Sequence, residues 1–263
     1  MRRLLTLVRF PPVAVAVCIL ATTVAAQSRR IEPIFPNPSN TLSLVYRRVR
    51  FDYQGEKSPT TPLGEVEPLV GVRYASPQWW TRGVLSALYS RPHVSADSAA
   101  SAGMLDLQGI VWYDLFGRRV QRRTNLRVIV GMGGGYRRIR TVARSVGERS
   151  FNVGHFEFQG GAALASRLSS RVVLEAQSAP LVGLSTTKDA TTRAIPHHWN
   201  YGCDSDVALH LERALGATLG LTVGGGLRLQ RLALPARKLF PNGTTEPFRY
   251  SSVELSARAG IHW

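Results

Sequence analysis

The feature that most constrains this chain is an alternation of apolar and polar residues that returns along most of its length. In the last segment, every odd position from Val253 to Trp263 is apolar, and the even positions between them are mostly polar or charged. Side chains on a strand point to opposite faces with a period of two, so each such segment predicts a strand with one apolar face. No segment shows sustained helical periodicity. The sequence therefore predicts an all-β protein.

The connections between these segments narrow the architecture. Short ones near 76–78, 167–170 and 214–216 and one of moderate length at 117–124 alternate with long ones at 54–66, 91–103, 140–151, 185–200 and 234–247. Counting the segments predicts about ten strands, with eight as the alternative, and places both ends of the chain on the side of the short turns. An antiparallel up-and-down transmembrane β-barrel is expected to have this pattern, whereas a sandwich gives no reason for loop length to alternate.

The N-terminal region predicts export. Arg2, Arg3 and Arg9 precede an apolar stretch over 13–26, which ends in small residues before Gln27. A positive segment, a short apolar core and a small-residue exit are typical of a cleaved secretory signal peptide. We therefore predict a signal peptide at 1–26, an extended periplasmic lead-in at 27–40 and a β-barrel domain at 41–263.

Charge and cysteine content limit the partners. The chain carries a net charge of +16, and loss of three arginines with the leader leaves +13. Such an excess favours an anionic partner, namely nucleic acid, lipid phosphate or a charged cell surface, and export argues against nucleic acid. Cleavage also removes Cys18, so that Cys203 alone remains and no internal disulfide can form.

The polar faces predict the contents of the barrel. If the apolar positions meet lipid, the polar ones line a narrow lumen, where both signs of charge must be paired. In 42–53, for example, apolar Val49, Phe51 and Tyr53 would point outward, and Arg48 and Arg50 inward. The predicted lumen charges are Arg48, Arg50, Arg73, Arg82, Arg127, Arg228 and Arg258 with Asp106, Asp114, Glu157, Glu175, Glu212 and Glu254.

The last strand carries a resemblance to a known family. Its alternating apolar positions and terminal aromatic residue resemble the C-terminal assembly signal of bacterial outer-membrane β-barrel proteins. These positions are Val253, Leu255, Ala257, Ala259, Ile261 and Trp263. The resemblance implies an integral location in the bacterial outer membrane and recognition by the outer-membrane assembly machinery. A terminal aromatic ring is also favoured at a membrane interface.

Two stretches could hold chemistry. The glycines of VIVGMGGGYRR (128–138) are compatible with phosphate binding, but no helix pattern follows them, and we interpret them as positions where a strand bends. IPHHWNYGCDSD (195–206), predicted as a loop, contains the metal-ligand types His197, His198, Cys203, Asp204 and Asp206, and its histidines could serve a hydrolase with Ser205. Neither stretch has the spacing of a known site, so we predict no catalytic residue, no cofactor and no metal.

Arginines gather near the predicted barrel ends and suggest contact with phosphates. One group lies in a short-side turn and the other on the long-loop side, where lipopolysaccharide phosphates would be the partners. The short-side group is Arg118, Arg119, Arg122 and Arg123. The long-loop group is Arg137, Arg138, Arg140, Arg144 and Arg149.

The function predicted from the sequence is that of a non-enzymatic outer-membrane barrel with a closed or narrow charged lumen and long surface loops. Its role would be structural, adhesive or weakly pore-forming, and its main partner the lipid bilayer. Two alternatives stay open, namely an outer-membrane lipid hydrolase or acyltransferase, and a soluble periplasmic β-barrel that carries a ligand.

Overall fold

The computed structural model describes residues 40–55, 65–78, 81–93, 100–115, 124–143, 147–189, 195–234 and 248–263. The predicted signal peptide at 1–26 and the lead-in at 27–40 lie outside the described residues, apart from Asn40. Within the described ranges, no helix has the length and apolar character needed to span a membrane.

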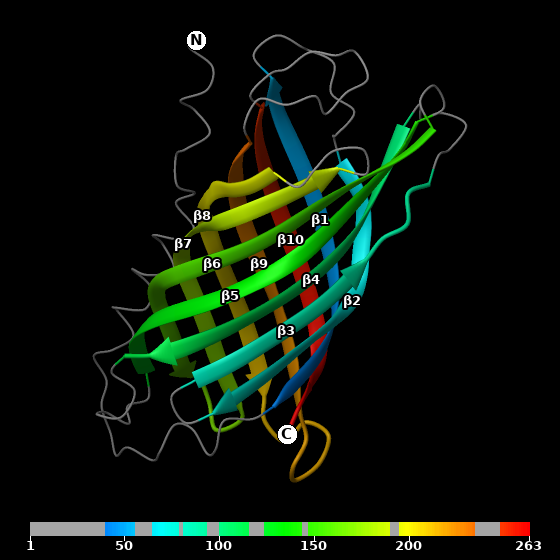
Figure 1. Ribbon diagram of the computed structural model, residues 1–263. Coiled ribbons are helices and arrows are strands. Elements are labelled where there is room, and N and C mark those ends of the chain that lie inside the picture. Colours follow the sequence, from blue (N-terminus) through cyan, green and yellow to red (C-terminus); the bar gives the residue numbers. More distant parts are fainter. Residues whose placement is uncertain are drawn as a thin grey trace, which may run out of the picture.

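In the described part of the chain, ten β-strands follow one another in sequence order (Figure 1). They are β1 (Thr41–Gly55), β2 (Glu65–Gln78), β3 (Thr81–Tyr89), β4 (Ala100–Asp114), β5 (Thr124–Ala143), β6 (Gly147–Arg167), β7 (Val172–Asp189), β8 (Ile195–Leu211), β9 (Gly220–Leu234) and β10 (Phe248–His262). Each strand pairs with its neighbours in the sequence, and β1 also pairs with β10. The prediction of an antiparallel up-and-down barrel of ten strands is confirmed.

The barrel closes along a continuous seam between β1 and β10. The register runs without a break from Thr41 opposite His262 to Gly55 opposite Phe248. Beyond it, the backbones of Asn40 and Trp263 exchange two hydrogen bonds, with N···O distances of 2.9 and 3.0 Å. The strict alternation of the last segment follows from this position, because β10 separates the interior from the outside while its backbone bonds to strands on both sides. Five of its six predicted signal residues, Leu255, Ala257, Ala259, Ile261 and Trp263, are exposed, and Val253 is half-buried.

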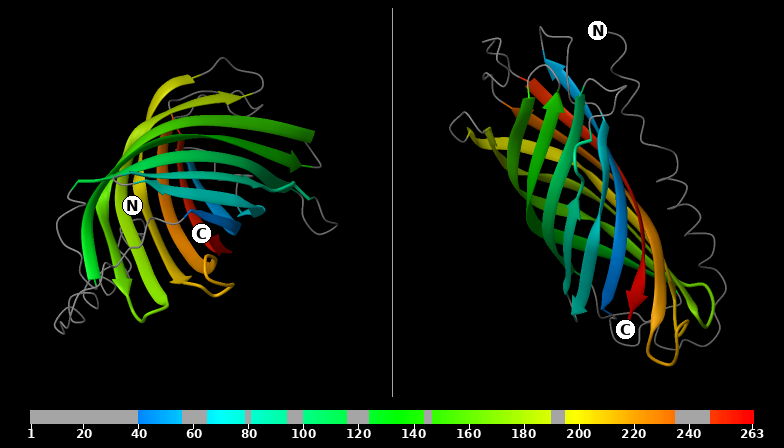
Figure 2. Two further views of the ribbon diagram at one scale, coloured as in Figure 1. Left: turned by 90° about the horizontal axis from the view of Figure 1, so that it is seen from below. Right: turned by 90° about the vertical axis from the view of Figure 1, so that its right-hand side faces the viewer.

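The two ends of the barrel differ. We call the end with Asn40 and Trp263 the turn end, and the opposite end the loop end. The turns at 168–171 and 212–219 lie at the turn end, beside the C-terminus (Figure 2). In the second turn, Gly216 has a φ of 124°, a conformation that side chains with a Cβ rarely adopt.

Two of the predicted long connections are wrong. At 140–151 the strands β5 and β6 continue as far as Ala143 and Gly147, and at 185–200 the strands β7 and β8 continue to Asp189 and Ile195. Charged and polar residues interrupt the apolar alternation in both segments. A strand that projects beyond the apolar surface needs no apolar outer face, which is why the pattern ends before the strand does. Figure 1 shows the green β5 and β6 reaching far toward the loop end.

Candidate functional site

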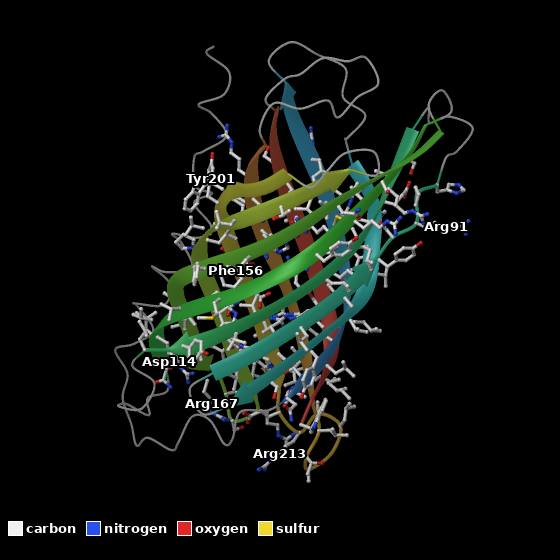
Figure 3. All side chains as sticks on the ribbon, in the orientation of Figure 1. Arg91, Asp114, Phe156, Arg167, Tyr201 and Arg213 are labelled. Carbon is white, nitrogen blue, oxygen red and sulfur yellow. The ribbon has the colours of Figure 1, made fainter. Side chains whose placement is uncertain are left out.

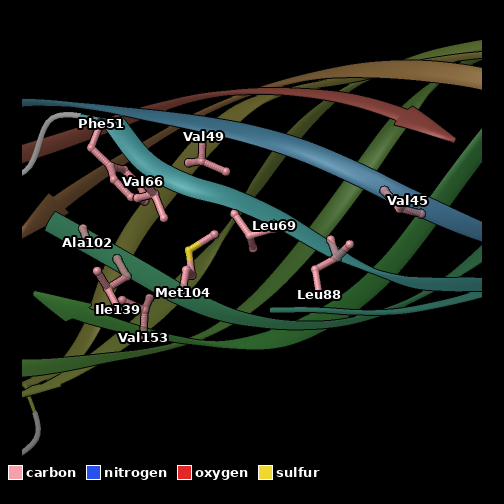
Figure 4. Packing of buried hydrophobic residues seen from close by; sticks show 10 residues of the cluster. All are labelled: Val45, Val49, Phe51, Val66, Leu69, Leu88, Ala102, Met104, Ile139 and Val153. Carbon is pink, nitrogen blue, oxygen red and sulfur yellow. The ribbon is translucent and has the colours of Figure 1, made fainter. Parts of the chain in front are cut away.

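Apolar side chains fill part of the interior near the loop end (Figure 4). Val49 and Phe51 of β1 point inward there and are almost fully buried. The remaining members of this cluster are Val45, Val66, Leu69, Leu88, Ala102, Met104, Ile139 and Val153. The expectation that apolar positions point only outward is therefore wrong for this part of the barrel. A small barrel is filled by its own side chains, and apolar groups are favoured where water is excluded.

Next to this cluster, toward the turn end, ion pairs cross the lumen. Arg137 of β5 donates from Nε to Asp106 Oδ1 at 2.9 Å, and its Nη2 lies 2.7 Å from Glu254 Oε1 of β10. Arg47 of β1 donates from Nη1 to the same two carboxylates, at 2.5 Å to Asp106 and 3.2 Å to Glu254. Both carboxylates and Arg137 are buried. Two arginines and two carboxylates thus neutralise one another where a lone charge would be very unfavourable.

A second group joins β9 to β6. Arg228 donates from Nη2 to Glu157 Oε2 at 2.6 Å, and its Nη1 lies 3.7 Å from Asp204 Oδ2 of β8. Gln159 donates from Nε2 to Glu157 Oε1 at 2.7 Å. Arg137 reaches strand β9 as well, because its Nη1 donates to Gln230 Oε1 at 3.1 Å. The first group therefore contacts the same strand that holds Arg228.

A third group lies closer to the turn end. Arg82 of β3 pairs with Glu175 of β7, and Arg258 of β10 donates to both carboxylate oxygens of Asp206 on β8. Arg73 of β2 lies 3.9 Å from the same Asp206. Because β2 and β3 stand opposite β7 and β8 in the ring, these contacts again cross the lumen.

A chain of hydrogen bonds leads from this group toward the C-terminus. His210 Nε2 lies 3.1 Å from Glu175 Oε2, and His210 Nδ1 lies 3.0 Å from Thr222 Oγ1. Thr222 Oγ1 is in turn 3.0 Å from Nδ1 of His262. These hydrogen bonds connect polar side chains of β7, β8, β9 and β10 in the part of the lumen near the turn end.

Two further pairs lie at the turn end. Arg167 and Glu212 form two hydrogen bonds of 3.0 Å each, and Arg127 Nε lies 3.5 Å from Asp114 Oδ2. Figure 3 shows Asp114 and Arg167 near this end. These side chains are only partly buried, so they contribute less than the central pairs.

The three central groups place paired charges across the middle of the lumen. They combine six arginines, namely Arg47, Arg73, Arg82, Arg137, Arg228 and Arg258, with six carboxylates, namely Asp106, Glu157, Glu175, Asp204, Asp206 and Glu254. Between them lies a cavity of about 70 Å³, lined in part by Arg47, Asp204 and Arg228. Sites for small molecules usually measure about 300–1,000 Å³, so this cavity has room only for water molecules.

Two of the predicted lumen charges lie elsewhere. Arg48 and Arg50 are exposed on the outer face of β1, and Arg47 occupies the interior instead. Leu42, Leu44 and Tyr46 share the parity of Arg48 and are exposed as well. This run of apolar even positions was the signal that would have placed Arg47 inside. The other predicted lumen residues lie in the ion pairs described above.

The predicted lumen set lacks Arg137, which the sequence pattern groups with the arginines of the long-loop side, and Asp204 and Asp206, which fall in the predicted loop at 195–206. Arg137 lies within β5, on the face opposite Tyr136, and both aspartates lie within β8. For Arg137 the signal was present, since the alternation that ends in Tyr136 already places the next residue inside.

The predicted loop at 195–206 lies within strand β8, and the candidate ligands Cys203, Asp204 and Asp206 divide between the two faces of the sheet. The side chains of His197 and His198 lie outside the part of the chain that the structure describes. Asp204 and Asp206 pair with interior arginines. On the opposite face, the hydroxyls of Ser205 and Ser178 are 2.8 Å apart, and Cys203 Sγ is 3.8 Å from Ser205 Oγ. Among the described residues, no group of three or more His, Cys, Asp or Glu side chains could hold a metal ion.

The glycine-rich stretch at 128–138 lies entirely within β5. A Cβ at Gly131 would come within 2.7 Å of the Trp112 ring, and one at Gly133 within 2.4 Å of the Gly109 carbonyl oxygen. These glycines therefore allow neighbouring groups to approach the strand closely. Strand β5 continues through these glycines without interruption, so the stretch contains no helix N-terminus that could bind a phosphate.

The outer face of the barrel is predominantly apolar over its middle. Aromatic residues border this belt near each end. Tyr74, Tyr113 and Trp263 lie toward the turn end, and Tyr136 and Tyr201 lie toward the loop end. The exposed apolar residues between them include Leu44, Val72, Leu85, Leu107, Val128, Val130, Met132, Phe156, Phe158, Val182, Leu209, Val223, Leu229 and Leu255. Figure 3 shows Phe156 between Tyr201 and Asp114 along the barrel.

No protein-family model and no curated protein matches the chain. Among solved structures, it is similar to the outer membrane protease OmpT from Escherichia coli, with a TM-score of 0.44, 8% identity and coverage of 90% of this chain and 99% of that one. It is also similar to the translocator domain of the autotransporter NalP from Neisseria meningitidis, with a TM-score of 0.39, 10% identity and coverage of 95% and 94%. For the attachment invasion locus protein Ail of Yersinia pestis, the TM-score is 0.33, the identity 10% and the coverage 86% and 98%.

Proposed function

We propose that this protein is an integral outer-membrane β-barrel with a lumen closed to solutes, and that its outer surface and loops carry its function. The observation that carries the proposal is the set of ion pairs across the lumen. Arg137 with Glu254 and Arg82 with Glu175 each join opposite walls. A solute-conducting pore needs a continuous water-filled path, whereas these side chains occupy the interior.

The distribution of polarity supports a membrane location over a soluble ligand carrier. A soluble carrier would hold its ligand in an apolar interior and expose charges to water. Here the central interior holds paired charges, and the outer belt exposes residues such as Leu44, Val130 and Leu229. An apolar outer band with aromatic residues at both borders is typical of transmembrane barrels.

The geometry favours a non-enzymatic role over a lipid hydrolase or acyltransferase. Ser205, the serine considered as a nucleophile, bonds to Ser178 on the outer face, whereas the neighbouring Asp204 and Asp206 serve interior ion pairs. A nucleophile needs a base within hydrogen-bond reach and an orienting group behind that base.

Export by a cleaved signal peptide, recognition by the assembly machinery and contact with lipopolysaccharide phosphates are parts of the same proposal. A chain with this outer belt must reach the outer membrane without folding in water. The arginines near the loop end, Arg138 and Arg91 among them, are exposed where phosphates of the outer leaflet would lie.

Two measurements on one purified sample test this proposal. In planar bilayers the protein should show no conductance steps above the protein-free baseline, and in a lipid-hydrolysis assay it should show no turnover. Large stable channels would contradict the closed lumen. Hydrolysis that is lost in His197→Ala or His198→Ala would establish the enzyme instead.

A further inference from the structure

The outer face over β2 to β5 contains a groove of about 490 Å³. Its floor passes over Gly109 of β4 and Gly134 of β5, which are direct cross-strand partners. Leu85, Leu107 and Tyr136 rise around these glycines and are partly exposed. Two adjacent positions without side chains thus create an apolar depression in the outer wall of the barrel.

The wall of the groove nearest the loop end is held in place. The hydroxyl of Tyr136 donates to Asn152 Oδ1 of β6 at 2.7 Å. Asn152 is itself the cross-strand partner of Arg138, the next outward residue of β5 after Tyr136. The tyrosine ring is therefore anchored directly below an exposed arginine.

A second arginine stands on the other side of the groove. Tyr89 of β3 pairs with Leu105 of β4, and Leu105 pairs with Arg138 of β5, so these three residues form one row at the loop-end limit of the groove. Arg91 follows Tyr89 by two residues and is exposed toward the loop end (Figure 3). Arg91 and Arg138 thus frame the groove where its apolar lining ends.

An exposed tyrosine is followed two residues later by an exposed arginine at three places in the barrel. Tyr46 is followed by Arg48 on β1, Tyr89 by Arg91 after β3, and Tyr136 by Arg138 on β5, and all six residues are exposed. Tyrosine rings are favoured at the membrane interface, and an arginine just beyond them meets the headgroup phosphates. The guanidinium binds phosphate through two parallel hydrogen bonds.

We propose that this groove binds lipopolysaccharide, with one acyl chain over Gly109 and Gly134 and a phosphate bound by Arg138 and Arg91. The inference rests on the proposed function, because it requires the loop end to face the outer leaflet. Charge complementarity determines the choice of ligand, since the two cations lie at the headgroup side of an apolar groove. The groove volume is within the range of about 300–1,000 Å³ that is usual for small-molecule sites.

The test is native mass spectrometry of the detergent-purified barrel titrated with lipopolysaccharide. Dephosphorylated lipopolysaccharide and phosphatidylglycerol are the comparison lipids. One tightly bound molecule of intact lipopolysaccharide is expected, with affinity at least about ten-fold above that of either comparison lipid. Equal binding of phosphatidylglycerol would overturn the assignment to lipopolysaccharide.

Two variants address the two parts of the site. Arg138→Gln with Arg91→Gln removes the cations, and Gly109→Leu fills the groove, where only the flexible end of Leu85 must shift to admit a Cβ. Each variant should weaken binding by about ten-fold. The controls are Arg171→Gln in a turn-end loop and Gly160→Leu, which adds the same side chain to an open part of the outer face. Unchanged binding in both site variants would overturn the proposal.

The two proposals can fail separately. All binding measurements use protein already shown by membrane fractionation to be inserted in the outer membrane. Recovery of the protein in the soluble periplasm would remove the proposed function, whereas an inserted barrel that binds both comparison lipids equally well would remove only the lipopolysaccharide site.

Discussion

Arg137 and Glu254 meet across the full width of the barrel, with Nη2 2.7 Å from Oε1, although β5 and β10 stand on opposite sides of the ring of strands. Asp106 binds the same guanidinium at 2.9 Å through Nε. One arginine therefore serves two buried carboxylates from opposite walls. Its removal affects more than one pair, and this makes it the most informative interior residue to change.

Arg137→Met should lower the free energy of unfolding by about 3–5 kcal/mol, because Asp106 and Glu254 lose a partner inside the barrel. Urea unfolding of the barrel in lipid vesicles, followed by tryptophan fluorescence, measures the change. Arg171→Met is the control in an exposed turn, with an expected effect within about 0.5 kcal/mol. A loss below about 1 kcal/mol for Arg137→Met would contradict the crossing network.

Combining Arg137→Met with Glu254→Gln should cost less than the two single changes added together. The carboxylate left without its arginine in the first variant is neutral in the double variant, so the difference should amount to about 0.5–3 kcal/mol. Arg137→Met with Glu212→Gln is the comparison, since Glu212 pairs with Arg167 at the turn end. The second pair should be additive within about 0.5 kcal/mol, and strong coupling there would show that the effect is not local.

Lysine at two outward positions of β5 should have different costs. Val130 lies midway along the apolar part of the strand, and Leu126 lies close to its turn end. Val130→Lys should reduce the stability of the inserted barrel by about 2–4 kcal/mol and Leu126→Lys by about 0–1 kcal/mol, because the cost of a charge depends on its depth in the membrane. Unfolding in phospholipid vesicles measures both, and equal costs would be evidence against a membrane-spanning belt.

Gly133→Val should be strongly destabilising, since its Cβ would lie 2.4 Å from the backbone oxygen of Gly109. Overpacking of this kind costs about 1–3 kcal/mol or more. Gly160→Val is the matched control on β6, where nothing lies within 4 Å of the new Cβ, and it should leave the thermal midpoint unchanged or raise it. If both variants unfolded alike, the close approach at Gly133 would have no energetic role.

Trp263→Asp should yield exported protein that fails to insert, because it places a charge at the end of the last strand. Trp263→Phe should insert like the original chain. Gel mobility with and without heating, together with membrane fractionation, distinguishes the folded barrel from exported but uninserted chain. Normal insertion of the aspartate variant would mean that the terminal aromatic residue is no part of the assembly signal.

The ring of strands was predictable because the constraint that produces it acts residue by residue. A wall between an apolar outside and a filled interior imposes a period of two, and this period is visible from Leu126 to Tyr136 and from Val253 to Trp263. The strand tips beyond the belt, such as 140–143 in β5, escape this constraint. Their extent therefore could not be predicted from the pattern.

The interior was only partly predictable. The rule that polar residues face inward placed Glu254 and Arg228 correctly but put Arg48 inside in place of Arg47. The reason is that β1 changes character along its length: its outer face changes from apolar residues to Arg48, and its inner face changes from Arg47 to apolar residues. Which arginine meets which carboxylate depends on the strand tilt and on the stagger at closure, and alternation carries no information about either. The contact of Arg137 with Glu254 is a result of that three-dimensional stagger.

The cross-lumen pairs also bear on the order in which the chain folds. Arg47 and Asp106 are 59 positions apart in the sequence, and Arg228 and Glu157 are 71 apart. Such contacts form only when distant strands come together, so they favour slow, cooperative folding. A sheet that has not yet joined β1 to β10 would expose these charges without their partners. Closure of the seam and neutralisation of the interior should therefore occur as one event, and half-assembled barrels should be too unstable to accumulate.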